Sequence, residues 1–199
     1  VKGNLLLGGD GGANSAQIES TGFLHLLGTG EYWRDINLNG FAPVASAPTN
    51  VVINGGTVLG RAFSGTGVAV TQLFDAVEMM HFWKEGSSIT SHIHWMPSTA
   101  AAGNVRWKLT YCISVDGAVV TAETTIAVLT ATPGVAWQGM RSDFAAIVMA
   151  GYLIGTQLHL RLWRDPADGL DTYTADAVIS SWGIHVLCDT IGSRAITTK

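Results

Sequence analysis

Charged side chains are scarce in this chain. Only 13% of its 199 residues are Asp, Glu, Lys or Arg, while 47% are hydrophobic, whereas soluble domains usually carry about 25% charged residues. So weakly charged a surface exposes apolar patches, and such patches favour association with other chains. We therefore expect an oligomer in which neighbouring subunits cover part of the surface.

Basic residues and long apolar runs are also few. Lys and Arg number 11 against 15 Asp and Glu, a formal net charge of −4, so the chain has no basic stripe to neutralise phosphates. No stretch approaches the roughly 18 apolar residues of a membrane span. The first residues contain an apolar run of only three leucines, which does not fit a signal peptide. We expect no nucleic-acid partner, no membrane span and synthesis in a cytoplasm.

Sequence motifs of common enzymes are missing as well. No serine stands in a G-x-S-x-G elbow, and the glycine-rich pieces lack the lysine of a phosphate-binding loop. The two cysteines, Cys112 and Cys188, lie in predicted strands and could pair if those strands are neighbours, but we expect free thiols in a reducing compartment. These absences predict a protein that is not an enzyme and carries no cofactor.

The most regular stretch covers residues 86–115 and predicts two neighbouring β-strands joined by a loop at 97–103. In its second half, apolar side chains occupy every other position, as they do in a half-buried strand. These side chains are Val105, Trp107, Leu109, Tyr111, Ile113 and Val115. In its first half, one face carries Ile93 and Trp95, and the other carries His92 and His94.

Further short strands are expected at 51–53, 57–63, 68–83, 119–130, 156–165 and 176–189, the last with Val178 and Trp182 on one face. Residues 131–142 are predicted as a loop, and 143–151 fit either a helical turn or a strand. Eight or more strands separated by turn residues predict an all-β fold, an antiparallel β-sandwich, with the jelly roll as first choice.

The N-terminal part differs in composition from the rest. Residues 1–30 alternate short apolar runs with glycine-rich turns, and Pro43 and Pro48 space a linker of small residues. We therefore divide the chain into an arm and linker at 1–50 and a β-sandwich domain at 51–199. The arm is either flexible or packs on another subunit or scaffold.

Two histidines suggest a metal site. His92 and His94 lie at i and i+2, so they share a strand face, and with Gly86 they match the G-x5-H-x-H opening of the cupin metal motif. The glutamate that follows in cupins is missing, because no carboxylate occurs between His94 and Asp116. Three other histidines could complete a site in space: His81, His159 and His185. Histidines hydrogen-bonded to neighbours or at a subunit contact are the alternative, and we predict no metal.

Aromatic and acidic residues outline a possible ligand surface. Trp95 and Trp163 could stack on sugars, while the remaining tryptophans fit the core or a subunit contact. Four carboxylates cluster around one predicted loop and could bind calcium or simply be solvated. They are Asp165, Asp168, Asp171 and Asp176.

Several longer stretches resemble one known family. These are EYWRDI, HFWKEGSSITSHIHWMP, GNVRWKLTY and LHLRLWRDPADGLDTYTADAVISSWGIHVLCDTIGS. Together they span most of 31–194 and resemble a recurrent domain of tailed-bacteriophage virion proteins, found as head fibres, decoration proteins or fibre tips. Members often have a proline where Met80 precedes His81 here. The resemblance implies a trimeric, jelly-roll-like sandwich displayed on a virus particle, and it supplies no catalytic residues.

Three functions follow from these observations. The first is a virion structural protein, a homotrimeric capsid fibre, decoration or fibre-tip module that attaches to other virion proteins through its N-terminal arm. The second is a receptor module for host surface glycans that uses Trp95, Trp163 and the acidic loop with Asp165, Asp168 and Asp171. The third is a cupin-like metalloenzyme that uses His92 and His94.

Overall fold

The computed structural model describes residues 5–7, 15–19, 22–67 and 69–192. Its strands are β1 (Leu5–Leu7), β2 (Ser15–Ile18), β3 (Leu24–Leu27), β4 (Tyr32–Leu38), β5 (Thr49–Val52), β6 (Leu59–Phe63), β7 (Thr71–Glu78), β8 (Thr90–Pro97), β9 (Asn104–Ser114), β10 (Thr124–Ala131), β11 (Met140–Asp143), β12 (Gln157–Arg164) and β13 (Ala177–Cys188). Three single 3-10 turns, η1 (Gly28–Gly30), η2 (Val44–Ser46) and η3 (Ile53–Gly55), are the helices of the described part. None of them is long and apolar enough to cross a membrane.

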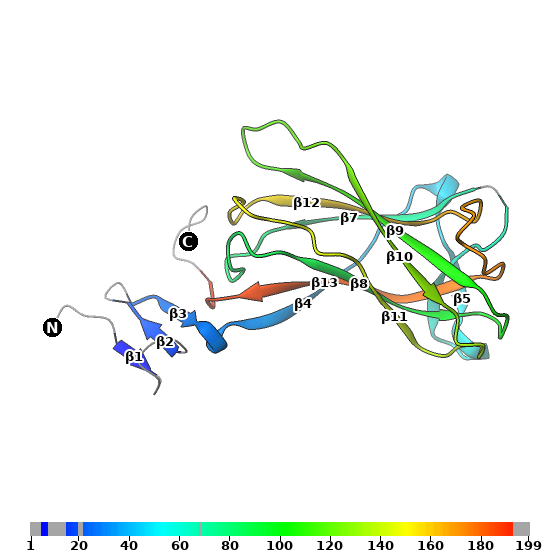
Figure 1. Cartoon of the computed structure of the whole chain (residues 1–199), viewed down its shortest axis with the longest axis horizontal. Coiled ribbons are helices and arrows are strands. Elements are labelled where there is room, and N and C mark those ends of the chain that lie inside the picture. The colour runs from blue at the N-terminus through cyan, green and yellow to red at the C-terminus, as the bar shows by residue number, and fades with distance from the viewer. Residues whose placement is uncertain (1–4, 8–14, 20–21, 68, 193–199) are drawn as a thin grey trace.

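The strands from β4 to β13 form two facing antiparallel sheets (Figure 1). The smaller sheet has the order β10-β9-β12-β7, and the larger has the order β11-β8-β13-β6-β5, with β4 also paired to β13. Successive strands from β6 to β13 cross repeatedly between the two sheets, which is the connectivity of an eight-stranded jelly roll. The predicted antiparallel sandwich of jelly-roll type is confirmed.

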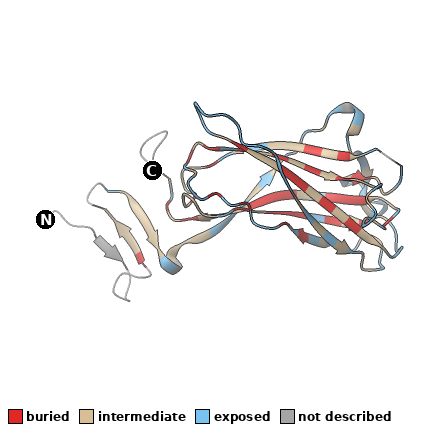
Figure 2. Cartoon of the chain, turned by 45° about the horizontal axis from the view of Figure 1, so that its top comes forward, coloured by how far each residue is buried: buried red, intermediate tan, exposed pale blue. Residues whose placement is uncertain are grey.

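The core lies between the sheets, where the inward side chains of both meet. In β9, Val105, Trp107 and Leu109 are fully buried, and they alternate with partly exposed polar residues. This alternation follows from the two-residue period of a strand, and it produces the striped burial in Figure 2. The predicted inner face is therefore confirmed from Val105 to Ile113, whereas Val115, expected on the same face, follows the end of β9 and is 41% exposed.

The last strand departs from the predicted alternation at one point. The pairing of β13 with β8 shifts in register between Ile179 and Ser181, as at a β-bulge. An extra residue in one strand exchanges the faces on either side of it, so Ile179 joins Trp182 in the core. Val178 was expected on that face, but it is buried close to the backbone of Gly60 on β6.

Two other segments also differ from expectation. β11 overlaps the end of the predicted loop 131–142 and the first residue of the undecided segment 143–151, and its four residues pair with β8. Four residues are too few to show a clear period in the sequence. β10 begins at Thr124 instead of 119, which leaves Val119 94% exposed in the preceding loop.

The first strands form a small separate sheet, β1-β2-β3, beyond one end of the sandwich (Figure 1). The backbone N–H of Leu26 donates to the carbonyl of Asp189 over 2.7 Å, and Lys84 pairs with Glu31 at 2.8 Å. β4 and part of β5 fall within the predicted arm and linker of 1–50, yet both strands pair with the larger sheet. Residues 1–4 and 8–14 of the arm lie outside the described residues.

Candidate functional site on the outer face of the larger sheet

Three neighbouring strands of the larger sheet place polar side chains on its outer face. In β4, Ile36 packs against the core, so Asp35 points outward by alternation. In β8, the inward side chains of Ile93 and Trp95 leave His92 on the outer face. On β13, His185 lies directly opposite Asp35 in the register. Asp35, His92 and His185, here called the His–Asp cluster, therefore meet on one surface.

A glycine lets this cluster close. Gly183 of β13 stands opposite His92 in the register, between β4 and β8. A Cβ at Gly183 would lie 2.9 Å from Asp35 Oδ1 and 3.1 Å from His92 Cε1. Because the glycine has no side chain, Asp35 reaches across β13 to His92.

The distances within the cluster are short. Asp35 Oδ2 lies 3.5 Å from His92 Nε2 and 3.6 Å from His185 Nε2. The two imidazole rings stack at 4.3 Å between centroids with an interplanar angle of 13°. One potential ligand atom from each of the three residues lies within 4.8 Å of the others, so two nitrogens and a carboxylate oxygen lie close together on this face.

Burial is uneven across the cluster. The His92 side chain is 3% exposed, whereas those of His185 and Asp35 are 24% and 51% exposed. Burial lowers the pKa of His92, although the charge of Asp35 acts in the opposite direction. At neutral pH, His92 is therefore mainly an uncharged imidazole with a lone pair available on one nitrogen.

His94 shares the face with His92 but not the cluster. Its ring stands edge-on to that of His92 at 5.3 Å between centroids, and the residue is exposed. Beside it, Arg141 binds Asp143 through three hydrogen bonds of 2.6–3.1 Å. Of the two predicted metal candidates, the structure brings His92 into a possible ligand set and leaves His94 at its border.

The rest of the ligand set comes from elsewhere in the chain. Of the three histidines that could complete a site, His185 does so, while His159 bonds Ser114 on the other sheet at 2.9 Å. The carboxylate missing from the cupin-like stretch is supplied by Asp35 of β4. Sequence reasoning missed Asp35 because only the pairing of β4 with β13 brings it near His92.

The two tryptophans predicted as sugar platforms are differently placed. Trp95 is fully buried, and its indole N–H donates to Ser142 at 3.0 Å, so the prediction of a ligand surface there was wrong. Trp163 is half-buried, with Lys108 Nζ and Arg161 Cζ over its ring at 4.5 and 4.7 Å. The inward position of Trp95 follows from the same strand alternation that turns His92 outward.

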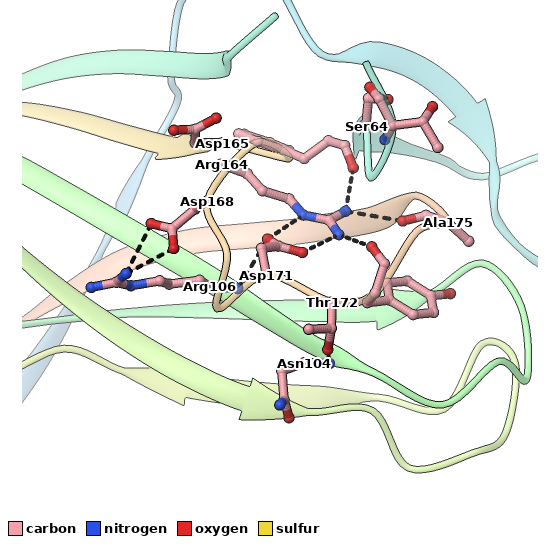
Figure 3. Close-up of polar contacts among 12 residues, drawn as sticks. Ser64, Asn104, Arg106, Arg164, Asp165, Asp168, Asp171, Thr172 and Ala175 are labelled. Atoms are coloured by element: carbon pink, nitrogen blue, oxygen red, sulfur yellow. Dashed lines mark hydrogen bonds and ion pairs between the residues drawn. The ribbon is translucent and has the colours of Figure 1, made fainter. Parts of the chain in front are cut away.

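The carboxylates of the acidic loop form ion pairs with basic side chains of the same protein (Figure 3). Asp168 binds Lys108 at 2.6 Å and Arg106 at 2.8 Å, and Asp165 lies 3.8 Å from Lys108. The hydrogen bond from Lys108 is the main cause that holds the pKa of Asp168 well below its usual range. These carboxylates neutralise neighbouring side chains, which argues against the solvated loop and the calcium site considered from the sequence.

Asp171 of the same loop is the partner of a buried arginine. Arg164 is fully buried, and its guanidinium donates to both carboxylate oxygens of Asp171 at 2.8 Å. Its other N–H groups bond the carbonyls of Phe63, Tyr173 and Ala175. The side chain of Asp171 is 1% exposed, so Asp171 holds the loop in place and is not available to a ligand.

Comparisons with known proteins give a fold-level likeness only. No protein-family model matches the chain, and no curated protein matches it. Among solved structures, the carbohydrate-binding module CBM35 from Cellvibrio japonicus Abf62 has 15% identity and a TM-score of 0.41, over 84% of this chain and 99% of its own. TmCBM61, solved with β-1,4-galactotriose, has 11% identity and a TM-score of 0.33, and the match covers 76% of this chain and 86% of TmCBM61. TmCBM27, a module that recognises mannan, has 11% identity and a TM-score of 0.34, and the match covers 77% of this chain and 88% of TmCBM27. At TM-scores this low, these likenesses carry no argument about ligand or activity.

Proposed function

We propose that this chain is a non-catalytic structural module of a virus particle that assembles with copies of itself, as a head-fibre, decoration or fibre-tip protein does. The observation that carries the assembly part of the proposal is the edge of the smaller sheet, while the virion setting rests on the sequence resemblance. β10 pairs only with β9 among the described strands, and its eight residues contain no charge. Natural sheet edges are usually protected by lysine, proline or a bulge, because a bare edge pairs with other chains.

Apolar side chains beside this edge support the same proposal. The β9–β10 hairpin exposes Val119 at 94%, Val120 at 48% and Leu129 at 48%. Burial of such surface contributes roughly 25 cal/mol per Å² to association. The edge carries no charge that would make identical copies repel each other, so a second copy of this chain is a suitable partner.

Light scattering on the purified chain tests assembly directly. The proposal expects a native mass of three times the chain mass of 21.0 kDa. The double variant Ala127→Lys/Leu129→Lys puts two charges on outward positions of β10 and is expected to reduce the mass to that of a monomer. Val148→Lys, at a position 65% exposed elsewhere, is the matched control and should keep the native mass. A wild-type chain that stays monomeric at high concentration refutes self-assembly.

The N-terminal sheet is the proposed attachment element for other virion proteins. It lies outside the sandwich, and the sandwich retains its own pairing from β4 onward. Deletion of residues 1–30 should therefore leave a folded protein, judged by circular dichroism, that no longer incorporates into particles. Particle binding by the folded deletion variant would contradict this role.

Carbohydrate binding is the second candidate, and a different tryptophan favours it. Trp33 is 61% exposed, and on β4 it shares the outer face with Asp35 and Asn37. An exposed indole beside polar groups suits a sugar ring, because the apolar ring face stacks while the hydroxyls are hydrogen-bonded. A glycan array should show binding that Trp33→Ala abolishes and Trp163→Ala retains. An array without hits eliminates this candidate.

A further inference from the structure

We propose that Asp35, His92 and His185 bind a divalent transition-metal ion, with Zn²⁺ the best fit, and that the ion fastens β4 to β13 and β8. Two imidazole nitrogens and one carboxylate oxygen are a ligand set that zinc commonly takes, with a water at the fourth position. Hard cations such as Ca²⁺ prefer oxygen ligands alone. The site is independent of the proposed assembly function.

The spacing of the three side chains fits such an ion. Bonds of about 2.0–2.1 Å in a tetrahedral site place neighbouring ligand atoms about 3.3 Å apart. Asp35 Oδ2 lies 3.5 and 3.6 Å from the Nε2 atoms of His92 and His185. The two imidazole planes lie within 13° of parallel, so the histidine side chains must also rotate before both Nε2 atoms point at one ion.

Hydrogen bonding alone leaves His92 incompletely satisfied. Its Nδ1 is buried and has no hydrogen-bond partner among the described residues. Its Nε2 lies 3.5 Å from the carboxylate of Asp35, beyond the 2.7–3.2 Å typical of an N–H···O bond. Buried polar groups in native proteins nearly always have partners, and an ion coordinated by Nε2 leaves Nδ1 as it is, so the weakly bonded Nε2 is the atom that an ion would satisfy. A bound ion would give Nε2 a strong partner.

The open side of the cluster suits the remaining position of the ion. The side chain of His92 is the buried member of the cluster, with 3% of it exposed, while the side chains of Asp35 and His185 are 51% and 24% exposed. Solvent therefore reaches the cluster from the side opposite His92. Gly183 keeps the space above β13 free, since a Cβ there would press on both Asp35 and His92.

Metal binding would link three strands that come from distant parts of the chain. β4 pairs with β13 on one side, and β8 pairs with β13 on the other. β4 is also the strand that follows the small N-terminal sheet. An ion held by all three strands would therefore stabilise the attachment of β4 to the sandwich.

The test is a zinc titration of chain made without a polyhistidine tag and freed of metal with EDTA. Competition with a chromophoric chelator should give about one Zn²⁺ per chain. Asp35→Asn and His185→Gln, both at partly exposed positions, should each weaken binding at least about tenfold. His94→Gln is the matched control on the same strand face and should bind as the wild type does.

Three results would overturn the proposal. They are wild-type binding well below one ion per chain, unchanged binding in both cluster variants, and an equal loss in His94→Gln. Hydrogen exchange tests the structural role separately, because Zn²⁺ should slow exchange of the β4 amides in wild type and His94→Gln but not in Asp35→Asn. Tight binding with unchanged β4 exchange refutes the fastening of β4.

Discussion

Arg164→Met is expected to lower the free energy of unfolding by about 3–5 kcal/mol, the cost of removing one partner from a buried ion pair. Methionine replaces the aliphatic part of the side chain but none of the donors. The carboxylate of Asp171, only 1% exposed, would keep a bond of 3.1 Å from the backbone N–H of Arg106. The carbonyls of Phe63 and Ala175 would lose hydrogen bonds of 2.9 and 3.0 Å.

The comparison with an exposed pair makes this prediction specific. Arg141 and Asp143 form an equally short pair, but their side chains are 45% and 49% exposed. Arg141→Met should therefore cost about 0–1 kcal/mol. The ion-pair geometry is similar, so burial, together with the bonds of Arg164 to backbone carbonyls, accounts for the expected difference.

Urea denaturation followed by tryptophan fluorescence measures both variants, at one protein concentration because assembly adds to stability. If Arg164→Met does not fold, Asp171→Asn probes the same pair, since it removes the charge that Arg164 neutralises and should also destabilise the fold strongly. The double variant Arg164→Met/Asp171→Asn should be less destabilised than the sum of the two single changes. A cost for Arg164→Met within about 1 kcal/mol of that for Arg141→Met would refute the reasoning.

Three further predictions concern other parts of the fold. The pKa of Asp168 is lowered in the folded state, so its contribution to stability is complete above its ordinary pKa of about 3.9 and is lost as pH falls. In urea titrations, Asp168→Asn should therefore flatten the loss of stability below about pH 4. An unchanged slope would contradict this. Gly183→Ala should destabilise the folded protein by about 1–3 kcal/mol in thermal denaturation, because the added Cβ would lie 3.0 Å from the Ile36 carbonyl oxygen. Gly139→Ala is the control, since nothing lies within 4 Å of a Cβ at Gly139. Burial raises the pKa of Cys112, so this thiol should react with iodoacetamide more slowly at pH 7 than a cysteine in an unfolded peptide, and equal rates would show that it is not protected.

The class of fold could be predicted from the sequence because strand alternation is a local signal. Apolar side chains two residues apart mark an inner face wherever the strand lies, so Trp107 was expected in the core from its neighbours alone. The turn residues between strands indicated eight or more strands in an antiparallel arrangement. The same signal failed at the β-bulge after Ile179, because the hydrophobicity pattern does not show where a strand carries an extra residue.

The functional surface depended on pairings that no local pattern contains. Strand alternation in the sequence predicted that His92 and His94 share one face, but it could not predict which residues of other strands lie beside them. That Asp35 and His185 join His92, while His94 remains outside, is decided by the register of β4 and β8 against β13. The partners of the acidic loop were hidden for the same reason, since Arg106 and Lys108 stand far from it in the sequence.

The sequence by itself therefore determined the β-sandwich, the inner faces of its regular strands and the scarcity of charged side chains that motivates the proposed assembly. Tertiary structure decided which polar groups meet, because strand pairing joins residues that lie far apart along the chain. It bound Asp171 to the buried Arg164. It also assembled the His–Asp cluster above Gly183, where the absence of a side chain lets Asp35 of β4 and His92 of β8 approach each other.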